Sequence, residues 1–243
     1  KKYEACHTCH FLILQNLQMI HLLTILFMQE KNKAILFDLD GTLLNSGLTF
    51  LKIVNILKSK KKQGLVDFEM VRKYSSRGAY LILKHCFPNE TEESLSNLRA
   101  EFLDYYEDML VDNLILYDGI DSMLNKLDEK QVPWGIVTNK SWKYTKPIID
   151  EFGWDKRTPA IICPDHLKNS KPDPEGINLA LSKLNAKNTI SYYVGDHQRD
   201  IEAGKNAGTL TIACDWGYWE DDCNTWNADL IVSHPDGIIE WIF

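Results

Sequence analysis

A short apolar run ends in two acids and a glycine in the segment KAILFDLDGT, residues 33–42. Residues 34–37 are apolar without alternation, which is the pattern of a strand buried on both faces. Asp38 and Asp40 lie two residues apart, so they point to the same side of an extended chain. Gly41 then permits a sharp turn. The segment predicts a buried strand that delivers two carboxylates to one pocket.

Five further apolar runs follow along the chain, and helical patterns lie between most of them. The runs are residues 134–137, 160–163, 190–194, 210–213 and 229–232, and the helical patterns are residues 119–131, 141–152, 174–184 and 199–207. Strands that alternate with helices predict an α/β fold, a Rossmann-like parallel sheet with helices on both faces. Ligands of such sheets bind at the carboxyl ends of the strands. Asp38, Thr138, Asn139 and Asp196 all follow predicted strands.

One long segment, residues 45–113, separates the first predicted strand from the second and contains helical patterns only. It is far longer than an ordinary crossover connection. The helical patterns cover residues 48–62, 67–74, 77–87 and 91–111. We therefore expect an inserted all-helical cap domain over the strand ends, with residues 31–44 and 114–243 forming the α/β core.

The first thirty residues differ in character from the rest of the chain. Residues 11–27 form the longest apolar stretch, but it is at the short limit for spanning a bilayer and polar residues interrupt it. Met28, shortly before the first strand, is a natural translation start. We expect residues 1–30 to be an extension outside the fold, and membrane association only if residues 11–27 are a genuine part of the protein.

The charge balance limits the class of partner. The chain has 243 residues, with 27 Lys and Arg against 34 Asp and Glu, and a formal net charge of -7. An acidic chain has no general attraction for nucleic acid, so we expect no nucleic-acid partner. An anionic ligand would need local positive charge. Four of the six cysteines lie far apart in or beside apolar runs, which suits a reducing compartment and predicts a cytoplasmic protein.

The pair Asp38 and Asp40 allows two kinds of chemistry. Adjacent carboxylates repel each other, so one of them takes up a proton unless a cation joins the pair. With a cation they are oxygen ligands for a metal ion, and with a proton Asp40 is a general acid. For this pair taken alone, a solvated acidic turn is the alternative interpretation.

Further charged groups follow another predicted strand and a turn. The segment GDHQRD, residues 195–200, adds the carboxylates of Asp196 and Asp200. Four acids at one edge of a sheet would be costly without positive charge. Lys171, in the segment SKPDP at residues 170–174, is a lysine held between a turn and a helix start.

Thr138 and Asn139 complete this set of groups. They bring a hydroxyl, an amide and backbone N–H groups to the start of the next helix, where anions bind readily. Carboxylates, a hard cation, a lysine and an anion-binding segment are the groups that phosphoryl transfer requires. The nucleophile of such a reaction would be a carboxylate.

Four motifs in the order DLDGT, VTNK, SKPDP and GDHQRD resemble those of the haloacid-dehalogenase (HAD) superfamily of phosphohydrolases. The resemblance covers residues 33–240, and the helical segment resembles the α-helical cap of that family. The segments GIVTNK, SKPDPE, GDHQRDIEAGKNAG and WNADLIVSHP are similar to phosphoglycolate phosphatases and N-acetylmuramic acid 6-phosphate phosphatases. The presence of Asp40 argues against a dehalogenase. The motif of dehalogenases typically lacks this second aspartate, because their leaving group needs no proton.

This resemblance implies the catalytic and metal-binding roles. Asp38 is the nucleophile and a Mg²⁺ ligand. Asp40 is the acid/base and ligates the metal through its backbone carbonyl. Asp196 is a further metal ligand, and Asp200 supports the metal or Lys171.

The resemblance also implies which residues hold the substrate. Thr138, Asn139 and Lys171 bind the phosphoryl oxygens, with Thr138 and Lys171 counted as catalytic, and Gly41 is expected in the substrate-binding part of the site. Arg77 in the cap is the candidate to bind the rest of the substrate, because arginine forks suit carboxylates.

The function implied is Mg²⁺-dependent hydrolysis of a small phosphate monoester through an aspartyl-phosphate. Phosphoglycolate is the first expectation for the substrate and N-acetylmuramic acid 6-phosphate the second, and a sugar phosphomutase of the same superfamily is a further alternative. A phospho-accepting receiver domain is the alternative from a different class of protein. The partner is a small phosphorylated metabolite, and the chain is expected to be a monomer or a homodimer.

Overall fold

A computed structural model describes residues 33–187, 189–219 and 221–243. The expected N-terminal extension, residues 1–30, lies outside the described residues, and so does its apolar stretch. Within the described part of the chain, no helix has both the length and the apolarity that crossing a bilayer demands.

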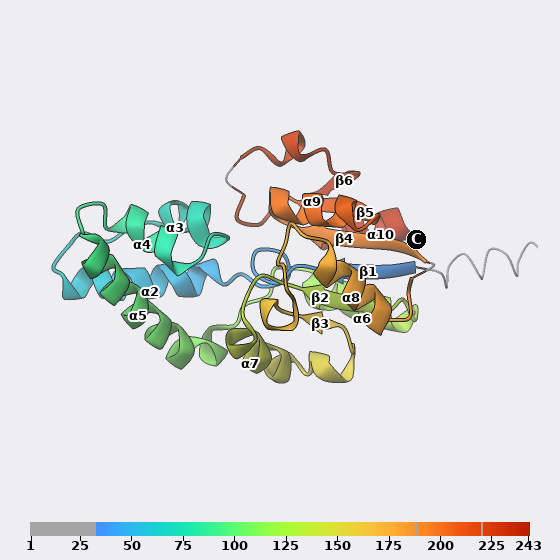
Figure 1. Ribbon diagram of the computed structural model, residues 1–243, viewed down its shortest axis with the longest axis horizontal. Coiled ribbons are helices and arrows are strands. Elements are labelled where there is room, and N and C mark those ends of the chain that lie inside the picture. Colours follow the sequence, from blue (N-terminus) through green and yellow to red (C-terminus); the bar gives the residue numbers. More distant parts are fainter. Residues whose placement is uncertain (1–32, 188, 220) are drawn as a thin grey trace, which may run out of the picture.

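Among the described residues, six parallel strands form one sheet in the order β3-β2-β1-β4-β5-β6 (Figure 1). The strands are β1 Lys33–Phe37, β2 Trp134–Val137, β3 Ile161–Ile162, β4 Ile190–Gly195, β5 Leu210–Cys214 and β6 Leu230–Val232. β1 lies between β2 and β4, with Phe37 opposite Ile136 and Val194. Because every pairing is parallel, the carboxyl ends of all strands meet at one edge. The predicted α/β fold with a parallel sheet is confirmed.

Helices cover both faces of this sheet. Ala34 and Leu36 of β1 share one apolar core with α8, Glu175–Lys183, and α9, Gln198–Asn206. The alternate residues Ile35 and Phe37 belong to the opposite core, to which α6 Ile120–Glu129, α7 Trp142–Phe152 and α10 Pro235–Ile242 contribute and which continues into the helices between residues 47 and 109. The unalternated apolar run of β1 thus fills two cores at once.

The helix α10 was not among the predicted elements, since no helical pattern was assigned beyond residue 207. His234 caps its start, where Nδ1 accepts a 3.3 Å hydrogen bond from the backbone N–H of Asp236. Pro235 occupies the first helical position, which proline favours. Ile238, Ile239 and Ile242 are buried against the core. The sequence of this helix begins with Pro235, Asp236 and Gly237, which are typical of a turn, so the sequence pattern did not distinguish it from a loop.

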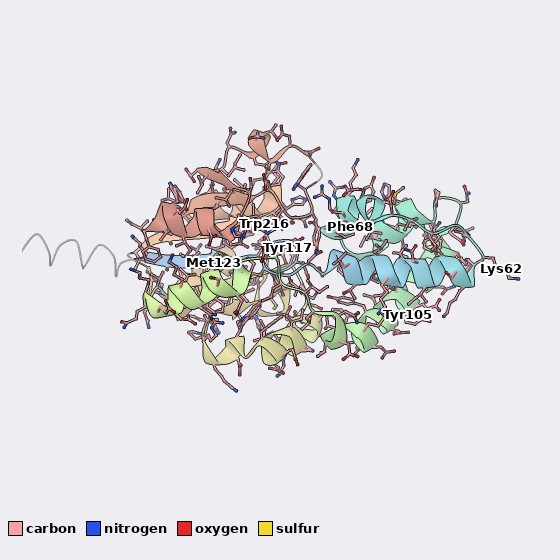
Figure 2. All side chains as sticks on the ribbon, turned by 180° about the vertical axis from the view of Figure 1, so that it is seen from behind. Lys62, Phe68, Tyr105, Tyr117, Met123 and Trp216 are labelled. Carbon is pink, nitrogen blue, oxygen red and sulfur yellow. The ribbon has the colours of Figure 1, made fainter. Side chains whose placement is uncertain are left out.

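Of the five described α-helices between β1 and β2, the first four form an insert beside the carboxyl ends of the strands (Figure 1). They are α2 Gly47–Lys60, α3 Phe68–Ser75, α4 Ala79–Cys86 and α5 Glu92–Met109. In Figure 2, Tyr117 and Trp216 lie where the insert meets the sheet, with ring centroids 6.4 Å apart, and Lys62 lies at the far end of the insert. Below, the insert means these four helices and their connections, and the core means the sheet with its covering helices.

Candidate active site

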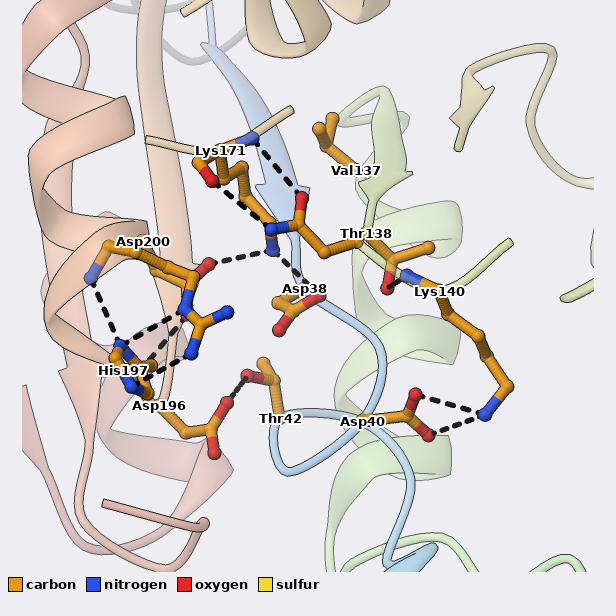
Figure 3. A network of polar contacts seen from close by, with 12 residues as sticks. Asp38, Asp40, Thr42, Val137, Thr138, Lys140, Lys171, Asp196, His197 and Asp200 are labelled. Atoms are coloured by element: carbon orange, nitrogen blue, oxygen red, sulfur yellow. Dashed lines mark hydrogen bonds and ion pairs between the residues drawn. The ribbon is translucent and has the colours of Figure 1, made fainter. Parts of the chain in front are cut away.

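Asp38 directly follows β1 at the centre of the sheet edge. Its backbone N–H donates a 2.9 Å hydrogen bond to the carbonyl of Val194, which fixes it beside the end of β4. Lys171 places Nζ 2.8 Å from Oδ1 of Asp38 and 2.7 Å from Oδ1 of Asp200 (Figure 3). Burial by itself lowers the pKa of Lys171, but the carboxylates of Asp200 and Asp38 outweigh it and raise the pKa. Lys171 is therefore a charged ammonium held between two acids.

Asp200 lies in the first turn of α9, and both of its carboxylate oxygens have partners. Oδ1 accepts from Lys171 at 2.7 Å, and Oδ2 accepts from the backbone N–H of His197 at 3.1 Å. Burial is the main cause that raises the pKa of Asp200, while Lys171 opposes the rise. Asp200 thus holds Lys171 in place from the side opposite to Asp38.

His197 caps the start of α9, and its Nδ1 accepts a 3.2 Å hydrogen bond from the backbone N–H of Arg199. Burial, followed by the positive charges of Arg199 and Arg77, lowers the pKa of His197 to about 4. The imidazole is therefore neutral near pH 7. Arg77, which comes from the insert, lines the same cavity as His197.

Asp196 is a fully buried acid at the end of β4, with an exposed fraction of 0%. Its Oδ1 accepts from the Thr42 hydroxyl at 3.2 Å, and its Oδ2 accepts from the backbone N–H of Tyr218 at 2.7 Å. Burial and the negative charges of Asp38 and Asp200 raise the pKa of Asp196 well above its ordinary value. A cation beside Asp196 would therefore stabilise the ionised form of this carboxylate.

Three of the acids form a cluster that could hold a metal ion. Asp38, Asp196 and Asp200 each place a carboxylate oxygen within 4.8 Å of the others. Oδ1 of Asp38 is buried and contacts Nζ of Lys171 over 2.8 Å, but Lys171 is shared with Asp200 and so offers a single positive charge to two carboxylates. Buried carboxylates without sufficient positive charge are costly, so a hard cation with oxygen ligands fits this cluster.

Gly41 lies against Asp196. Its φ is +89°, a conformation that favours glycine, and a Cβ atom at this position would lie 2.1 Å from Oδ2 of Asp196. We expected Gly41 in the substrate-binding part of the site, but it is not among the residues that line the cavity there. Its observed contribution is to let the turn after Asp40 approach Asp196 closely.

Thr138 and Asn139 follow β2 beside Asp38. The hydroxyl of Thr138 accepts a 3.2 Å hydrogen bond from the backbone N–H of Lys140. The Asn139 amide donates to the backbone carbonyl of Lys171 and accepts from its N–H, both over 3.1 Å. Asn139 therefore fastens the segment that carries Lys171 to the end of β2.

A cavity of about 400 Å³ lies between the sheet edge and the insert. It brings together seven of the predicted site residues, namely Asp38, Asp40, Thr138, Asn139, Lys171, Asp200 and, from the insert, Arg77. Asp196 and Gly41 are not among its lining residues. Two arginines that the sequence analysis did not single out, Arg99 of α5 and Arg199 of α9, also line it. The cavity therefore combines the acids with guanidinium groups from both parts of the molecule.

Two further residues of the site were missed from the sequence. Lys140 donates from Nζ to both carboxylate oxygens of Asp40, over 3.1 and 3.0 Å. Its place directly after Asn139 was a signal that could have been used. Tyr218 holds Asp196 through its backbone N–H, and the local signal for it is the neighbouring Gly217, where a Cβ atom would lie 2.2 Å from Cβ of Asp196.

Proteins of known family resemble this chain in sequence. A sequence model described as haloacid dehalogenase-like hydrolase matches residues 35–214. An N-acetylmuramic acid 6-phosphate phosphatase of Pseudomonas putida is 38% identical over 84% of this chain and 92% of its own length. A phosphoglycolate phosphatase of Xanthomonas campestris pv. campestris is 35% identical over 86% of this chain and 95% of its own length.

Solved structures share the fold. The crystal structure of a predicted phosphoglycolate phosphatase from Haemophilus somnus superposes with a TM-score of 0.77 at 24% identity, covering 89% of this chain and 100% of that one. The resemblance inferred from the four motifs is confirmed by the family match and by the relatives. The chain belongs to the haloacid dehalogenase-like hydrolase family.

Proposed function

We propose that this protein is a Mg²⁺-dependent phosphatase that hydrolyses a small phosphate monoester through an aspartyl-phosphate on Asp38. The observation that carries the proposal is the position of Asp38, which faces the cavity, contacts Lys171 and shares a cluster with Asp196 and Asp200. The relatives named as phosphatases support the class of reaction.

Four residues have distinct roles in the proposed reaction. Asp38 attacks phosphorus in line with the ester bond, so that an acyl phosphate forms as the bond to the leaving oxygen breaks. Asp40 gives a proton to the departing alkoxide and then takes one from the water that hydrolyses the acyl phosphate. Lys171 and the Thr138 hydroxyl donate to the phosphoryl oxygens. Both carboxyl groups are restored at the end of the cycle.

The metal would be held by Asp38, Asp196 and Asp200, together with the backbone carbonyl of Asp40. When bound, Mg²⁺ supplies positive charge that offsets the charge of the phosphoryl oxygens. Asp200 has a second task, because its two oxygens already accept from Lys171 and His197. Its carboxylate keeps Lys171 directed at Asp38.

The charge of the cavity supports a substrate with a second anionic group. Arg77, Arg99 and Arg199 line the same cavity as Asp38. A guanidinium can bind a carboxylate through two parallel hydrogen bonds. Phosphoglycolate is our first candidate, because the charged lining by itself accounts for recognition of its phosphate and its carboxylate.

N-acetylmuramic acid 6-phosphate is the second candidate. It also carries a carboxylate, and a cavity of about 400 Å³ leaves room for a sugar ring. The relative at 38% identity is named for activity on this compound. Family membership argues against a receiver domain, and release of inorganic phosphate without a phosphorylated product would distinguish a phosphatase from a phosphomutase.

We propose a cytoplasmic location and a monomer or homodimer. Cys86, Cys163, Cys214 and Cys223 are free and buried, as suits a reducing compartment.

The test compares substrates and one insert variant. We would measure kcat/KM for phosphoglycolate, N-acetylmuramic acid 6-phosphate and ethyl phosphate, which resembles phosphoglycolate but lacks the carboxylate. Arg77→Ala should lower kcat/KM for phosphoglycolate about tenfold, equivalent to about 1.4 kcal/mol, and should leave ethyl phosphate nearly unchanged. A preference for the sugar phosphate of tenfold or more would reverse our order of candidates. Equal losses on phosphoglycolate and ethyl phosphate would remove Arg77 from carboxylate binding.

A further inference from the structure

Lys140 connects the proposed acid/base to the insert. Its Nζ donates to Oδ1 and Oδ2 of Asp40 over 3.1 and 3.0 Å, and it also donates to the hydroxyl of Tyr106 on α5. Figure 3 shows the Asp40 carboxylate turned toward Lys140, while Asp38 faces Lys171. The two neighbouring acids of the first motif are therefore held by two different lysines.

The ammonium group of Lys140 lies in an aromatic enclosure. It is 4.6 Å from the ring centroid of Tyr106 and 5.9 Å from that of Phe50, both on helices of the insert. Tyr144 of α7 packs against Tyr106 with ring centroids 5.4 Å apart. The Lys140 side chain is only 7% exposed, and among the described residues Asp40 is the carboxylate with which it forms an ion pair.

This enclosure limits the freedom of the Asp40 side chain. Because both of its oxygens accept from one buried ammonium, the carboxylate has a single favoured orientation. It keeps 20% of its side-chain surface exposed and lines the cavity, so it remains accessible to a substrate. Tyr106 holds the ammonium from the side of the insert, so the orientation of Asp40 depends on where α5 lies.

We propose that Lys140 and Tyr106 are positioning residues for Asp40, and that the insert takes part in acid–base catalysis through them. This inference rests on the proposed function, in which Asp40 is the acid/base. Lys140 sets the direction of the Asp40 carboxyl group toward the leaving oxygen, and Tyr106 sets the position of Lys140. Displacement of α5 from the core would remove one acceptor and part of the aromatic cover from Lys140, and it would release Asp40 from its orientation.

The test uses two substrates of similar shape whose leaving groups differ in their need for a proton. Phenyl phosphate depends on protonation more strongly than p-nitrophenyl phosphate does. Lys140→Met should lower kcat/KM for phenyl phosphate about tenfold more than kcat/KM for p-nitrophenyl phosphate, and Tyr106→Phe should show the same bias at about threefold. In an Asp40→Asn background, neither substitution should change kcat by more than about twofold, because its effect passes through Asp40.

Two control variants separate positioning from a general tether between insert and core. Lys143, in the first turn of α7, forms a 2.6 Å ion pair with Glu107, the residue that follows Tyr106 on α5, and both side chains are exposed on the surface. Lys143→Met should leave kcat for both substrates unchanged. Lys140→Arg keeps the charge and can donate to both oxygens, so it should recover part of the loss. If Lys140→Met fails to fold, Tyr106→Phe decides alone, because it removes one oxygen and keeps the ring in place.

The outcomes are distinct. Equal losses on the two substrates, or the same losses in the Asp40→Asn background, would overturn the positioning role while leaving the phosphatase assignment intact. An Asp40→Asn enzyme with full activity on phenyl phosphate would remove Asp40 from acid–base catalysis, and the inference would fail with that part of the proposed function.

Discussion

The backbone N–H of Tyr218 donates a 2.7 Å hydrogen bond to Oδ2 of Asp196. The hydroxyl of the same tyrosine accepts from the backbone N–H of Gly47 at 2.6 Å and donates to Oδ1 of Asn45 at 3.1 Å. Asn45 and Gly47 lie where the chain enters the insert. Tyr218 therefore joins a proposed metal ligand to the connection between core and insert, and a disturbance of Asp196 should reach beyond the metal site.

Mg²⁺ should raise the melting temperature, and the increase should be larger at higher pH. Burial, with the charges of Asp38 and Asp200, raises the pKa of Asp196, so the folded protein keeps a proton that the unfolded chain releases. The free energy of unfolding of the metal-free protein consequently falls as pH rises through that raised pKa. Bound Mg²⁺ offsets this loss, because it stabilises the carboxylates after they have lost their protons. At ~100 times Kd, binding stabilises by about 2.7 kcal/mol, or roughly 5–10 °C.

Scanning calorimetry near pH 6 and near pH 8, with and without Mg²⁺, measures this effect. A shift that is absent, or larger at the lower pH, would contradict the acid cluster as the metal site.

EDTA should abolish activity, and Ca²⁺ should restore little of it, because Ca²⁺ takes more ligands at longer distances.

Gly41→Ala should destabilise the protein more than Gly208→Ala. Both glycines have positive φ, +89° and +75°, so each substitution carries a left-handed penalty of about 1–2 kcal/mol. A Cβ atom at Gly41 also overlaps Oδ2 of Asp196, whereas one at Gly208 meets no heavy atom within 4 Å. Urea unfolding gives both free energies. Of the two variants, only Gly41→Ala should lose its Mg²⁺ response, and equal behaviour of the two would count against the close approach of Gly41 to Asp196.

Asp40→Asn should slow the enzyme by a factor that depends on the leaving group. General acid–base assistance contributes about 10²–10⁴-fold, and a good leaving group needs little of it. The value of kcat/KM, which covers the steps up to formation of the acyl phosphate, should therefore fall much further for an alkyl phosphate than for p-nitrophenyl phosphate. Identical losses on both esters would show that Asp40 has no role as general acid.

The thiol of Cys163 should be inert in the folded protein, although it follows β3 at the sheet edge that carries the site. Burial raises the pKa of Cys163 to about 11, so the thiol stays protonated near pH 7.5. Treatment of the folded protein with iodoacetamide should not change its activity and should not label Cys163. The same treatment of urea-unfolded protein should label Cys163. Loss of activity in step with labelling of Cys163 would show that this thiol is reactive.

Much of the fold and the acid cluster could be predicted because their signals are local. The run before Asp38 is apolar without alternation, and it fills the cores on both faces of the sheet. Parallel strands then bring their ends together, so Asp38, Asp196 and Asp200 meet without any knowledge of side-chain packing. The helices of the insert were predicted for the same reason, from helical patterns that lie within single segments.

The rest depends on how distant segments pack. The contact of Lys140 with Asp40 spans 100 positions of sequence, and its contact with Tyr106 requires α5 to lie against the start of α7. Tyr218 acts on Asp196 through its backbone N–H, a group that every residue except proline carries. The local signals, namely the place of Lys140 directly after Asn139 and of Tyr218 directly after Gly217, do not show which acid each residue contacts, and only the packing of distant segments decides that.

The most direct test of Asp38 as the nucleophile is to trap its acyl phosphate. Enzyme carrying Asp40→Asn, in which hydrolysis of the intermediate is slow, would be mixed with p-nitrophenyl phosphate and Mg²⁺, quenched in acid and reduced with borohydride. Borohydride converts an aspartyl-phosphate to homoserine, so peptide mass spectrometry should find homoserine at position 38, and Asp38→Asn should abolish both the product and turnover. A burst of nitrophenol with an unmodified Asp38, or with the modification at another residue, would contradict the account.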